Sequence, residues 1–324
     1  MQKEAGKVNP GFPGVSVIIP CYNYARFLGA ALDSVLGQTY SNLEVIVIDD
    51  GSSDNTAEVA ALYAGRIRYI HQENQGLSAS RNNGIALASH DLLAFLDADD
   101  EWEPEFVSTL IDKLQELPDS FGLVACLDHK IGADGKRIPD RAHDSITGEV
   151  NTRDLLLKNR FFPGATVVRK DLFLKTGGFD TELRSSEDRD MWIRLSSVCR
   201  LWILPDMLIR VRKHGSNMSG NGLRMRNNIR KVLAKARREN LVPRVNLPFW
   251  MQAYSILDYQ ISWIFFGEGN RGAALAGILR SLLLWPFPMK HSRLDVPAFF
   301  RLRAFFRFIF AWLKSLFHVE SKAS

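Results

Sequence analysis

Short apolar runs alternate with amphipathic segments through the first 120 residues of the chain. Apolar runs rich in β-branched residues predict strands at Val15–Ile19, Glu44–Ile48, Arg66–Ile70 and Leu92–Leu96. The segments between and after these runs predict helices at Tyr24–Leu36, Asp54–Tyr63, Ser78–Ala88 and Pro104–Leu117. Strands that alternate with helices make right-handed crossovers, so the pattern predicts an α/β fold with a mostly parallel sheet flanked by helices.

The composition is that of a folded globular protein. Of the 324 residues, 46% are hydrophobic and 24% are charged, which excludes a collagen, a disulfide scaffold and a wholly disordered chain. The cysteines have no paired spacing, which argues against a zinc site and favours a reducing compartment; they are Cys21, Cys126 and Cys199. Residues 1–13 lack the apolar core of a secretory signal, and we expect a flexible leader there.

Charge is divided unevenly along the chain. Residues 1–215 carry 24 Lys and Arg against 31 Asp and Glu, a net charge of −7. Residues 216–324 carry 17 against 5, a net charge of +12. An acidic part followed by a strongly basic part indicates two regions with different partners. The basic region suits an anionic membrane or a nucleic acid.

The end of the chain is aromatic as well as basic. Arg303, Arg307, Lys314 and His318 share one face of a predicted helix whose remaining positions are mostly Phe, Leu and Trp. This pattern is typical of a helix at a membrane interface and does not favour nucleic acid. The longest uncharged run in the region has thirteen residues, too few to span a bilayer. We therefore expect residues 218–324 to form a helical region that lies on a membrane surface, or alternatively contacts another subunit.

Polar residues follow three of the predicted strands. Pro20 and Tyr22 come after the first strand, Asp49 and Asp50 after the second, and an acidic run after the fourth, which consists of Asp97, Asp99 and Asp100. Ligands bind at the carboxyl ends of parallel strands, and all five carboxylates are expected at this one edge. The alternative is structural: Asp49 and Asp50 cap the next helix, and the acidic run forms a turn.

Carboxylates this close together repel one another unless a cation or several donors offset the charge. Carboxylate oxygens without nearby Cys or paired His favour Mg²⁺ or Mn²⁺ over zinc. Because Mg²⁺ usually binds substrate phosphates as well, the acidic edge predicts a phosphorylated substrate of the nucleotide type.

Several motifs, taken in order, resemble the inverting glycosyltransferases of family 2, which have the GT-A fold. They read VSVIIPCYNYARFL, LEVIVIDDGSSDNT, ENQGLSASRNNG, LDADD, GGFD with SSEDRDMW, and RVRKHGSNMS. The resemblance implies a GT-A glycosyltransferase domain over residues 14–217. It also implies a single displacement that moves a sugar from a nucleotide-diphosphate donor to a hydroxyl acceptor.

The resemblance assigns nucleotide binding to a set of residues near the strand ends: Pro20, Tyr22, Asp50, Arg81 and Asp97. It implies that Tyr22 stacks on the base, that Asp50 accepts a hydrogen bond from the base, and that Arg81 reaches a phosphate. The residues alone leave alternatives open. The alternative for Tyr22 is that its ring packs under its own loop. The alternative for Arg81 is that it is a solvated residue on the surface of its helix.

The resemblance places an Mn²⁺ or Mg²⁺ ion on Asp99 and His214, where it bridges the donor diphosphate. Asp100 follows directly, so the choice between Asp99 and Asp100 stays open. Asp188 is implied as the catalytic base, with Glu187 in reserve. Ser and Thr are typical cap residues, and Ser185–Ser186 predict the start of a helix over Glu187–Ser196. The first turn of a helix favours an ionised carboxylate, as a catalytic base requires. The alternative is that the acids stand there only because they stabilise the helix.

The resemblance further implies a bacterial enzyme of cell-surface polysaccharide or lipopolysaccharide synthesis that acts on a lipid-linked glycan. We expect a cytoplasmic protein peripheral on the inner face of the membrane, with a homo-oligomer as an option. The Q-x-x-R-W signature of processive members is absent, which predicts transfer of one or few sugars. The alternative functions are a lapsed transferase that acts as a membrane scaffold and a nucleotidyltransferase. The latter needs a glycine-rich, lysine-bearing loop after the first strand, and PCYNY is not one.

Overall fold

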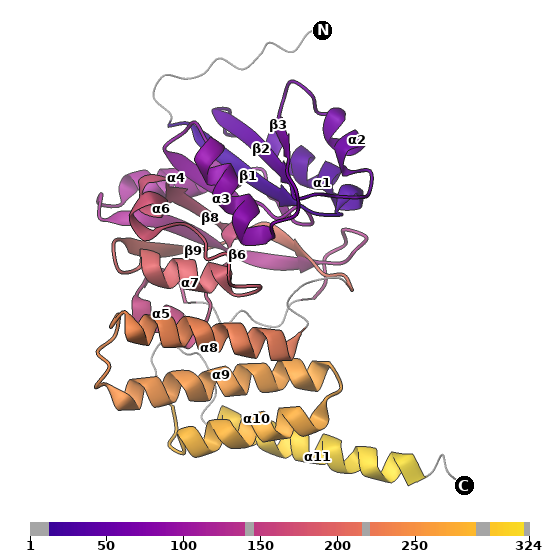
Figure 1. Cartoon of the computed structure of the whole chain (residues 1–324), viewed down its shortest axis with the longest axis vertical. Helices are drawn as coiled ribbons and strands as arrows, with labels where there is room; N and C mark the ends of the chain where they lie inside the picture. The colour runs from indigo at the N-terminus through magenta and orange to yellow at the C-terminus, as the bar shows by residue number, and fades with distance from the viewer. Residues whose placement is uncertain (1–12, 140–145, 216–220, 290–298, 321–324) are drawn as a thin grey trace. The chain divides into compact units, whose positions relative to one another are not determined.

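The computed structural model describes residues 13–139, 146–215, 221–289 and 299–320, with side chains as far as Lys314 in the last segment (Figure 1). The leader expected at residues 1–13 thus lies almost entirely outside the described residues. The chain divides into two compact units. Residues 1–143, 147–151 and 161–215 belong to the first unit, and residues 144–146, 152–160 and 216–324 to the second.

The first unit opens with four parallel strands in the order β3-β2-β1-β4. They are β1 (Val15–Cys21), β2 (Leu43–Asp49), β3 (Arg68–His71) and β4 (Leu92–Phe95). The helices of this half are α1 (Ala25–Leu36), α2 (Thr56–Ala61), α3 (Leu77–Leu87) and α4 (Phe106–Glu116). These elements confirm the predicted alternation. β1 runs two residues past its predicted end, so the buried Pro20 is a strand residue rather than a loop residue.

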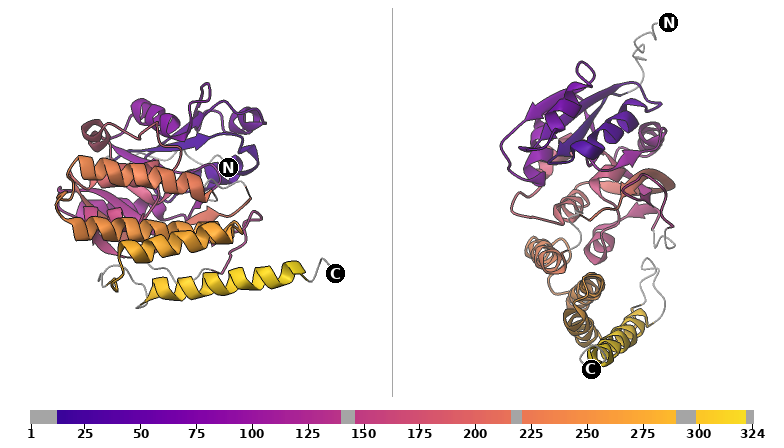
Figure 2. Two further views of the ribbon diagram at one scale, coloured as in Figure 1. Left: turned by 60° about the horizontal axis from the view of Figure 1, so that its bottom comes forward. Right: turned by 90° about the vertical axis from the view of Figure 1, so that its right-hand side faces the viewer.

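The second half of the unit extends the same sheet in the order β4-β8-β6-β9-β5, with β7 paired to β9. These strands are β5 (Glu101–Trp102), β6 (Phe121–Ile131), β7 (Gly148–Val150), β8 (Thr166–Arg169) and β9 (Arg200–Arg212). β8 is antiparallel to both β4 and β6, whereas β6 and β9 are parallel. The 3₁₀ turn Pro163–Ala165 and the helices α6 (Asp171–Thr176) and α7 (Glu187–Leu195) complete a mixed sheet flanked by helices (Figure 2).

Helix α3 approaches β1 so closely that no side chain fits between them. A Cβ atom added at Gly84 would lie 2.3 Å from Cγ2 of the fully buried Ile18. At Gly29 in α1 the same atom would lie 3.5 Å from the hydroxyl of Tyr63, an ordinary contact. The absence of a side chain at Gly84 therefore sets how closely α3 lies against the sheet.

The second unit is helical. It consists of α5 (Thr152–Leu157), α8 (Gly222–Arg238), α9 (Leu247–Gly267), α10 (Arg271–Leu284) and α11 (Phe300–Glu320). Helix α9 packs against α8 and α10, and α10 packs against α11. Helix α11 confirms the helix expected from the aromatic and basic pattern, although the side chain of His318 lies outside the described residues. Within the described residues, no helix combines the length and the apolar character needed to cross a membrane.

We predict that Gly84→Ala destabilises the first unit by about 1–3 kcal/mol, because the new methyl group overlaps Ile18 in a packed interface. The matched control is Gly29→Ala, which adds the same methyl group to a helix with room for it. That variant should keep or slightly raise stability, since alanine is the better helix former. Urea unfolding of both variants measures the difference. Equal stability of the two variants would show that the packing of α3 on β1 has room for a methyl group at residue 84.

Candidate active site

Hydrogen bonds connect the loop after β1 to the loop after β2. The side-chain carbonyl of Asn23 accepts a hydrogen bond from the backbone N–H of Ser53 at 2.8 Å. The backbone N–H of Asn23 donates to Oγ of Ser52 at 2.9 Å. Asn23 has a left-handed backbone (φ 57°), a strained conformation for a residue with a side chain. Tyr22, next to it, is 49% exposed, so it is not fully enclosed beneath its own loop.

Asp50 holds the segment that leads into α3. Its carboxylate accepts hydrogen bonds from Nε2 of Gln72 at 2.7 Å and from the backbone N–H groups of Gln75 at 2.9 Å and Gly76 at 2.8 Å. The residue is only 4% exposed. These three donors offset the cost of burying the charge. Any bond from Asp50 to a nucleotide base would add to this set.

Asp49 is buried beside Asp50 and faces β3. It accepts hydrogen bonds from the hydroxyl of Tyr69 and the backbone N–H of Ser52, and it pairs with Nδ1 of His71 at 3.1 Å. Burial raises the pKa of Asp49, but the hydrogen bonds outweigh it and bring the pKa below its ordinary value. The cap of α2 is at Asn55, so the alternative that Asp49 and Asp50 cap this helix is wrong.

Arg81 joins two acidic segments that are distant in sequence. Its guanidinium donates to Oδ1 of Asp97 and to Oε1 of Glu187, each at 2.7 Å. Its side chain is 1% exposed, which makes the alternative of a solvated surface arginine wrong. Burial lowers the pKa of Arg81, but the two carboxylates more than offset this and keep the group charged. Both terminal nitrogens are thereby used to fix the end of β4 to the start of α7.

The start of α7 carries the residue assigned as the base. Asp188 is partly buried, and its Oδ1 accepts a hydrogen bond from the backbone N–H of Arg189 at 2.7 Å. Ser186 occupies the N-cap position, as expected, but its side chain makes no capping hydrogen bond. Its backbone is instead left-handed (φ 61°), which costs about 1–3 kcal/mol. The surrounding structure holds this strain next to Asp188.

The acidic run after β4 separates into two different environments. Oδ2 of Asp99 lies 2.8 Å from Nε2 of His214, whose ring packs against Tyr24 and Phe27 at the start of α1. Asp100 is 5% exposed and accepts a hydrogen bond from the backbone N–H of Arg212 at 2.9 Å. Burial and the neighbouring carboxylates raise the pKa of both acids. Asp99 thus faces His214, whereas Asp100 faces the backbone of β9.

Arg212 anchors this acidic run from β9. Its Nε donates to the carbonyl of Asp99 at 3.0 Å, and its NH1 donates to the carbonyls of Gly132 at 3.2 Å and Ala133 at 3.3 Å. It also pairs with Glu101. The sequence motif RVRKHGSNMS contains Arg212 but does not assign it a role. Its position two residues before His214 is the only feature of the sequence that could have indicated one.

The residues near His214 fit a divalent cation with few protein ligands. Among the described residues, no three His, Cys, Asp or Glu side chains gather into a metal site. An octahedral Mg²⁺ at 2.0–2.1 Å from its ligands places neighbouring ligands about 3 Å apart. The oxygen of Asp99 and the nitrogen of His214, 2.8 Å apart, match that spacing. The remaining ligands would come from water and substrate phosphates, as is usual for Mg²⁺.

The structure therefore brings some of the assigned residues together and separates others. Arg81 connects Asp97 to Glu187, and Asp99 meets His214. Tyr22 and Asp50 lie at the ends of β1 and β2, and β1 separates β2 from β4 in the sheet. The assigned residues thus lie at the ends of β1, β2 and β4 and in the first turn of α7, apart from Arg81 inside α3 and His214 after β9.

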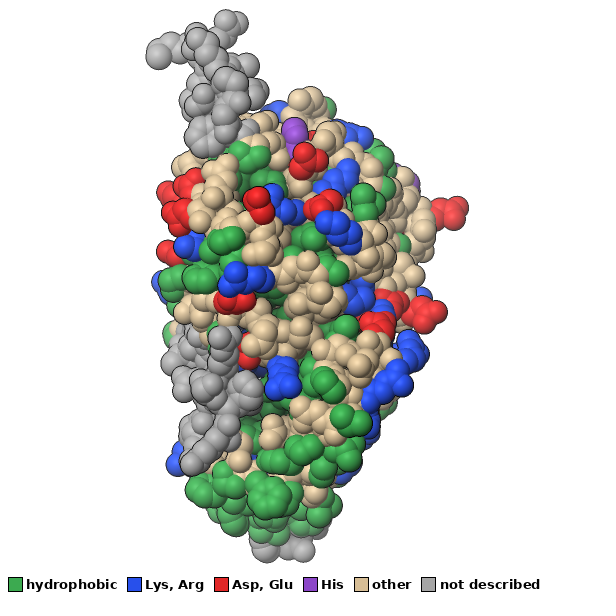
Figure 3. Space-filling view, turned by 90° about the vertical axis from the view of Figure 1, so that its left-hand side faces the viewer, with side chains coloured by type: hydrophobic (Ala, Val, Ile, Leu, Met, Phe, Trp, Pro, Cys, Tyr) green, Lys and Arg blue, Asp and Glu red, His purple; other side chains and the backbone are tan. Residues whose placement is uncertain are grey.

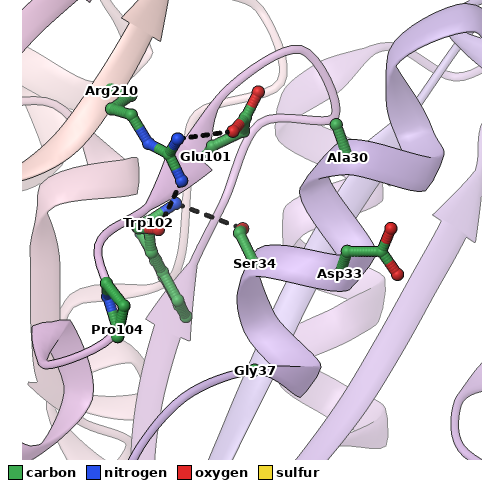
Figure 4. Close-up of a pocket in the computed structure, with 8 residues that line it drawn as sticks. All are labelled: Ala30, Asp33, Ser34, Gly37, Glu101, Trp102, Pro104 and Arg210. Carbon is green, nitrogen blue, oxygen red and sulfur yellow. Dashed lines mark hydrogen bonds and ion pairs between the residues drawn. The ribbon is translucent and has the colours of Figure 1, made fainter.

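A pocket of about 420 Å³ lies elsewhere in the first unit, between α1 and β5 (Figure 4). Arg210 lies on the β5 side of the pocket, 3.1 Å from Oε2 of Glu101. Its wall on α1 is formed by Ala30, Asp33, Ser34 and Gly37. None of the assigned site residues lines it, so this pocket is not the candidate active site.

Comparison with known proteins identifies the family. Residues 16–176 match the family model of glycosyl transferase family 2. An uncharacterized glycosyltransferase of Rickettsia typhi is 32% identical over 222 residues, which cover 67% of this chain and 69% of the relative.

Two solved structures have the same fold. S. aureus TarS 1–349, in complex with UDP-GlcNAc, matches with a TM-score of 0.57 and 19% identity over 84% of this chain and 89% of that one. The mannosyltransferase PcManGT from Pyrobaculum calidifontis, in complex with GDP-Man and Mn²⁺, has a TM-score of 0.59 and 20% identity over 85% and 77%. The fold class expected from the sequence is confirmed, and the chain belongs to glycosyl transferase family 2.

Proposed function

We propose that the chain transfers a sugar from a nucleotide-diphosphate donor to a hydroxyl acceptor, with inversion at the anomeric carbon. The observation that carries this proposal is the double ion pair of Arg81, which holds the first turn of α7 against the acidic run after β4. Asp188, the carboxylate proposed to act on the acceptor, and Asp97, the carboxylate proposed to bind the donor, are thereby kept at one edge of the sheet. The sugar nucleotides bound by TarS and PcManGT support a donor of this class.

In this proposal the donor nucleotide lies along the ends of β1, β2 and β4. The exposed ring of Tyr22 stacks on the base, beside Pro20 and Asp50. Asp97 keeps one carboxylate oxygen in its bond with Arg81, and the side chain is 30% exposed, which leaves surface for a ribose hydroxyl. Both terminal nitrogens of Arg81 are occupied by carboxylates, so in this proposal Arg81 acts by positioning Asp97.

Asp99 and His214 hold the divalent cation in this proposal, and Mn²⁺ in PcManGT supports its use. When bound, the ion offsets the negative charge that develops on the leaving diphosphate. The packing of His214 against Tyr24 and Phe27 fixes the ring, which keeps Nε2 directed at Asp99. Asp100 supports the loop through its bond with the backbone of Arg212.

Asp188 is the proposed base. It takes the proton of the acceptor hydroxyl as the oxygen attacks the anomeric carbon from the side opposite the diphosphate. Its place in the first turn of α7 favours the ionised form that a base requires. Glu187, the reserve candidate, is 7% exposed and paired with Arg81, so its carboxylate is less available for proton transfer. An α-linked donor would give a β-linked product.

The acceptor that we propose is a lipid-linked glycan in bacterial surface polysaccharide or lipopolysaccharide synthesis, at the inner face of the membrane. The basic and aromatic second unit supports an acceptor of this kind, since it suits the same surface. Lapsed catalysis and nucleotidyl transfer are not favoured by any feature of the site.

Replacement of Asp188 by Asn should lower the rate of transfer by roughly a hundredfold to ten-thousandfold, because the amide cannot accept the hydroxyl proton. Binding of the nucleoside diphosphate should change little. The matched variant is Glu187→Gln, which neutralises the neighbouring acid. Single-turnover transfer from a panel of nucleotide sugars measures both variants. If Asp188→Asn retains activity within a few-fold while Glu187→Gln is inactive, the base is Glu187.

Titration calorimetry with UDP, dTDP, GDP and CDP, each with and without Mn²⁺, should reveal one tight, metal-dependent diphosphate. Asp99→Ala should abolish the metal dependence, because one of the two protein donors is lost. The comparison variant is Asp119→Ala, which removes a fully exposed carboxylate and should behave like the wild type. Metal-independent binding to all four diphosphates would contradict the assigned cation site and favour the scaffold alternative.

Arg81→Met should destabilise the first unit by about 3–5 kcal/mol, since the buried Glu187 and the partly exposed Asp97 lose their common partner. The control Lys175→Met removes an exposed ion pair with Asp171 in α6 and should cost less than about 1 kcal/mol. Chemical unfolding monitored by circular dichroism compares the two. A loss of similar size in both variants would rule out a central structural role for Arg81.

A further inference from the structure

Large apolar side chains gather on the surface of α10 and α11. Each of the following is at least 38% exposed: Leu279, Leu283, Phe287, Phe299, Leu302, Phe306, Phe310, Trp312 and Leu313. Hydrophobic side chains cover this end of the second unit (Figure 3). The other large apolar residues exposed in the described part of the chain are spread over many elements. A concentration of this kind marks an interaction surface rather than ordinary surface composition.

Helix α11 orders these residues into stripes. Ala304 and Phe308 are buried on one face, where Phe308 stacks on Phe266 of α9 at 4.8 Å between ring centroids. On the opposite face, Phe306 and Phe310 are 65% and 70% exposed and lie four residues apart, one turn above the other.

A row of exposed cations borders this apolar stripe. Arg303, Arg307 and Lys314 are exposed, and at 100° per residue they fall within a narrow sector beside Phe310. The exposed face of α11 is therefore half apolar and half basic along its described length. An interfacial helix has this arrangement, with the apolar face in the acyl region and the cations at the level of the headgroups.

Arg301 holds the two helices together so that they present one surface. Its guanidinium is buried and donates to the carbonyls of Ser281, Trp285 and Phe287, at and beyond the end of α10. It also donates to Oγ of Ser255 in α9 at 2.8 Å. The carbonyls at a helix C-terminus favour a cation there. The apolar surface is thus fixed by the fold of the second unit before any partner arrives.

The charges on this surface indicate that its partner is negatively charged. Residues 271–289 and 299–314 contain no Asp or Glu, and their charged side chains are all basic. A second copy docked through the same surface would bring two basic rows together without any acidic counterpart in these segments. Negative lipid headgroups, in contrast, complement the cations while the acyl chains accept the aromatic stripe. We propose that the α10–α11 surface docks on an anionic phospholipid membrane.

The test is vesicle co-sedimentation of the full chain, with phosphatidylcholine alone against phosphatidylcholine mixed with phosphatidylglycerol. The wild type should bind the anionic vesicles and lose affinity as salt rises. Phe306→Ser with Phe310→Ser should reduce binding to the level of neutral vesicles. Arg303→Gln with Arg307→Gln should weaken binding to anionic vesicles by roughly 25-fold, at about fivefold per cation.

The matched control is Leu62→Ser with Leu174→Ser, which removes two equally exposed apolar residues of the first unit and should leave binding unchanged. Circular dichroism and binding of the nucleoside diphosphate check that each variant folds. Because this surface is separate from the proposed active site, the Phe and Arg variants should bind the diphosphate like the wild type. Failure of membrane binding is thereby distinguished from failure of the proposed function.

A second measurement needs no destabilising variant. Phospholipids brominated on their acyl chains should quench a tryptophan placed in the stripe by Phe310→Trp more strongly than the native Trp312, which lies one turn from the buried Phe308 on the other face of α11. Equal binding to neutral and anionic vesicles, or full binding by both double variants, would overturn the proposal. A dimer in sedimentation velocity that Phe306→Ser with Phe310→Ser dissociates would overturn it in favour of a second copy.

Discussion

The buried guanidinium of Arg81 is the interaction on which the candidate active site depends. It binds Asp97 and Glu187, two carboxylates from segments 90 residues apart, at 2.7 Å each. A buried charge is costly unless it is paired, so the fold is constrained to keep both partners in place. The start of α7, with Asp188 and the strained Ser186, consequently lies beside the end of β4. Loss of this one side chain would release both acids at once.

The same edge of the sheet carries more negative charge than Arg81 can offset. Three further acids each have their own hydrogen-bond or ion-pair partners. Asp50 has Gln72 and two backbone N–H groups, Asp100 has the backbone of Arg212, and Asp99 has His214. The loops after β1, β2 and β4 are therefore held by polar networks, which suits a site that must orient a charged donor. Tyr22 is exposed along this row, and Asp97 and Asp99 are partly exposed.

The second unit uses buried charge in a different way. Asp258 in α9 lies 3.6 Å from Arg226 of α8 and 3.8 Å from Arg280 of α10, while Arg301 of α11 binds main-chain carbonyls. One acid and three arginines thus connect four helices. The exposed cations of α11 lie beside the aromatic stripe, and Arg307 among them also packs over the rings of Trp263 and Phe266 in α9. The physical basis of the membrane proposal is this row of exposed cations along an exposed apolar stripe.

The alternation of the first four strands with helices, and the edge at which the acidic residues gather, could be predicted from the amino-acid sequence. Both follow from local periodicity and from the handedness of crossovers, which neighbouring residues encode. The antiparallel pairings after residue 100, the burial of Arg81 and the pairing of His214 with Asp99 rather than Asp100 could be seen only in the folded chain. These features depend on contacts across 106 residues for Arg81 and Glu187, and 115 for Asp99 and His214, which no local pattern records. A buried arginine and a surface arginine on a helix look alike until the partners that desolvate and neutralise them are in place.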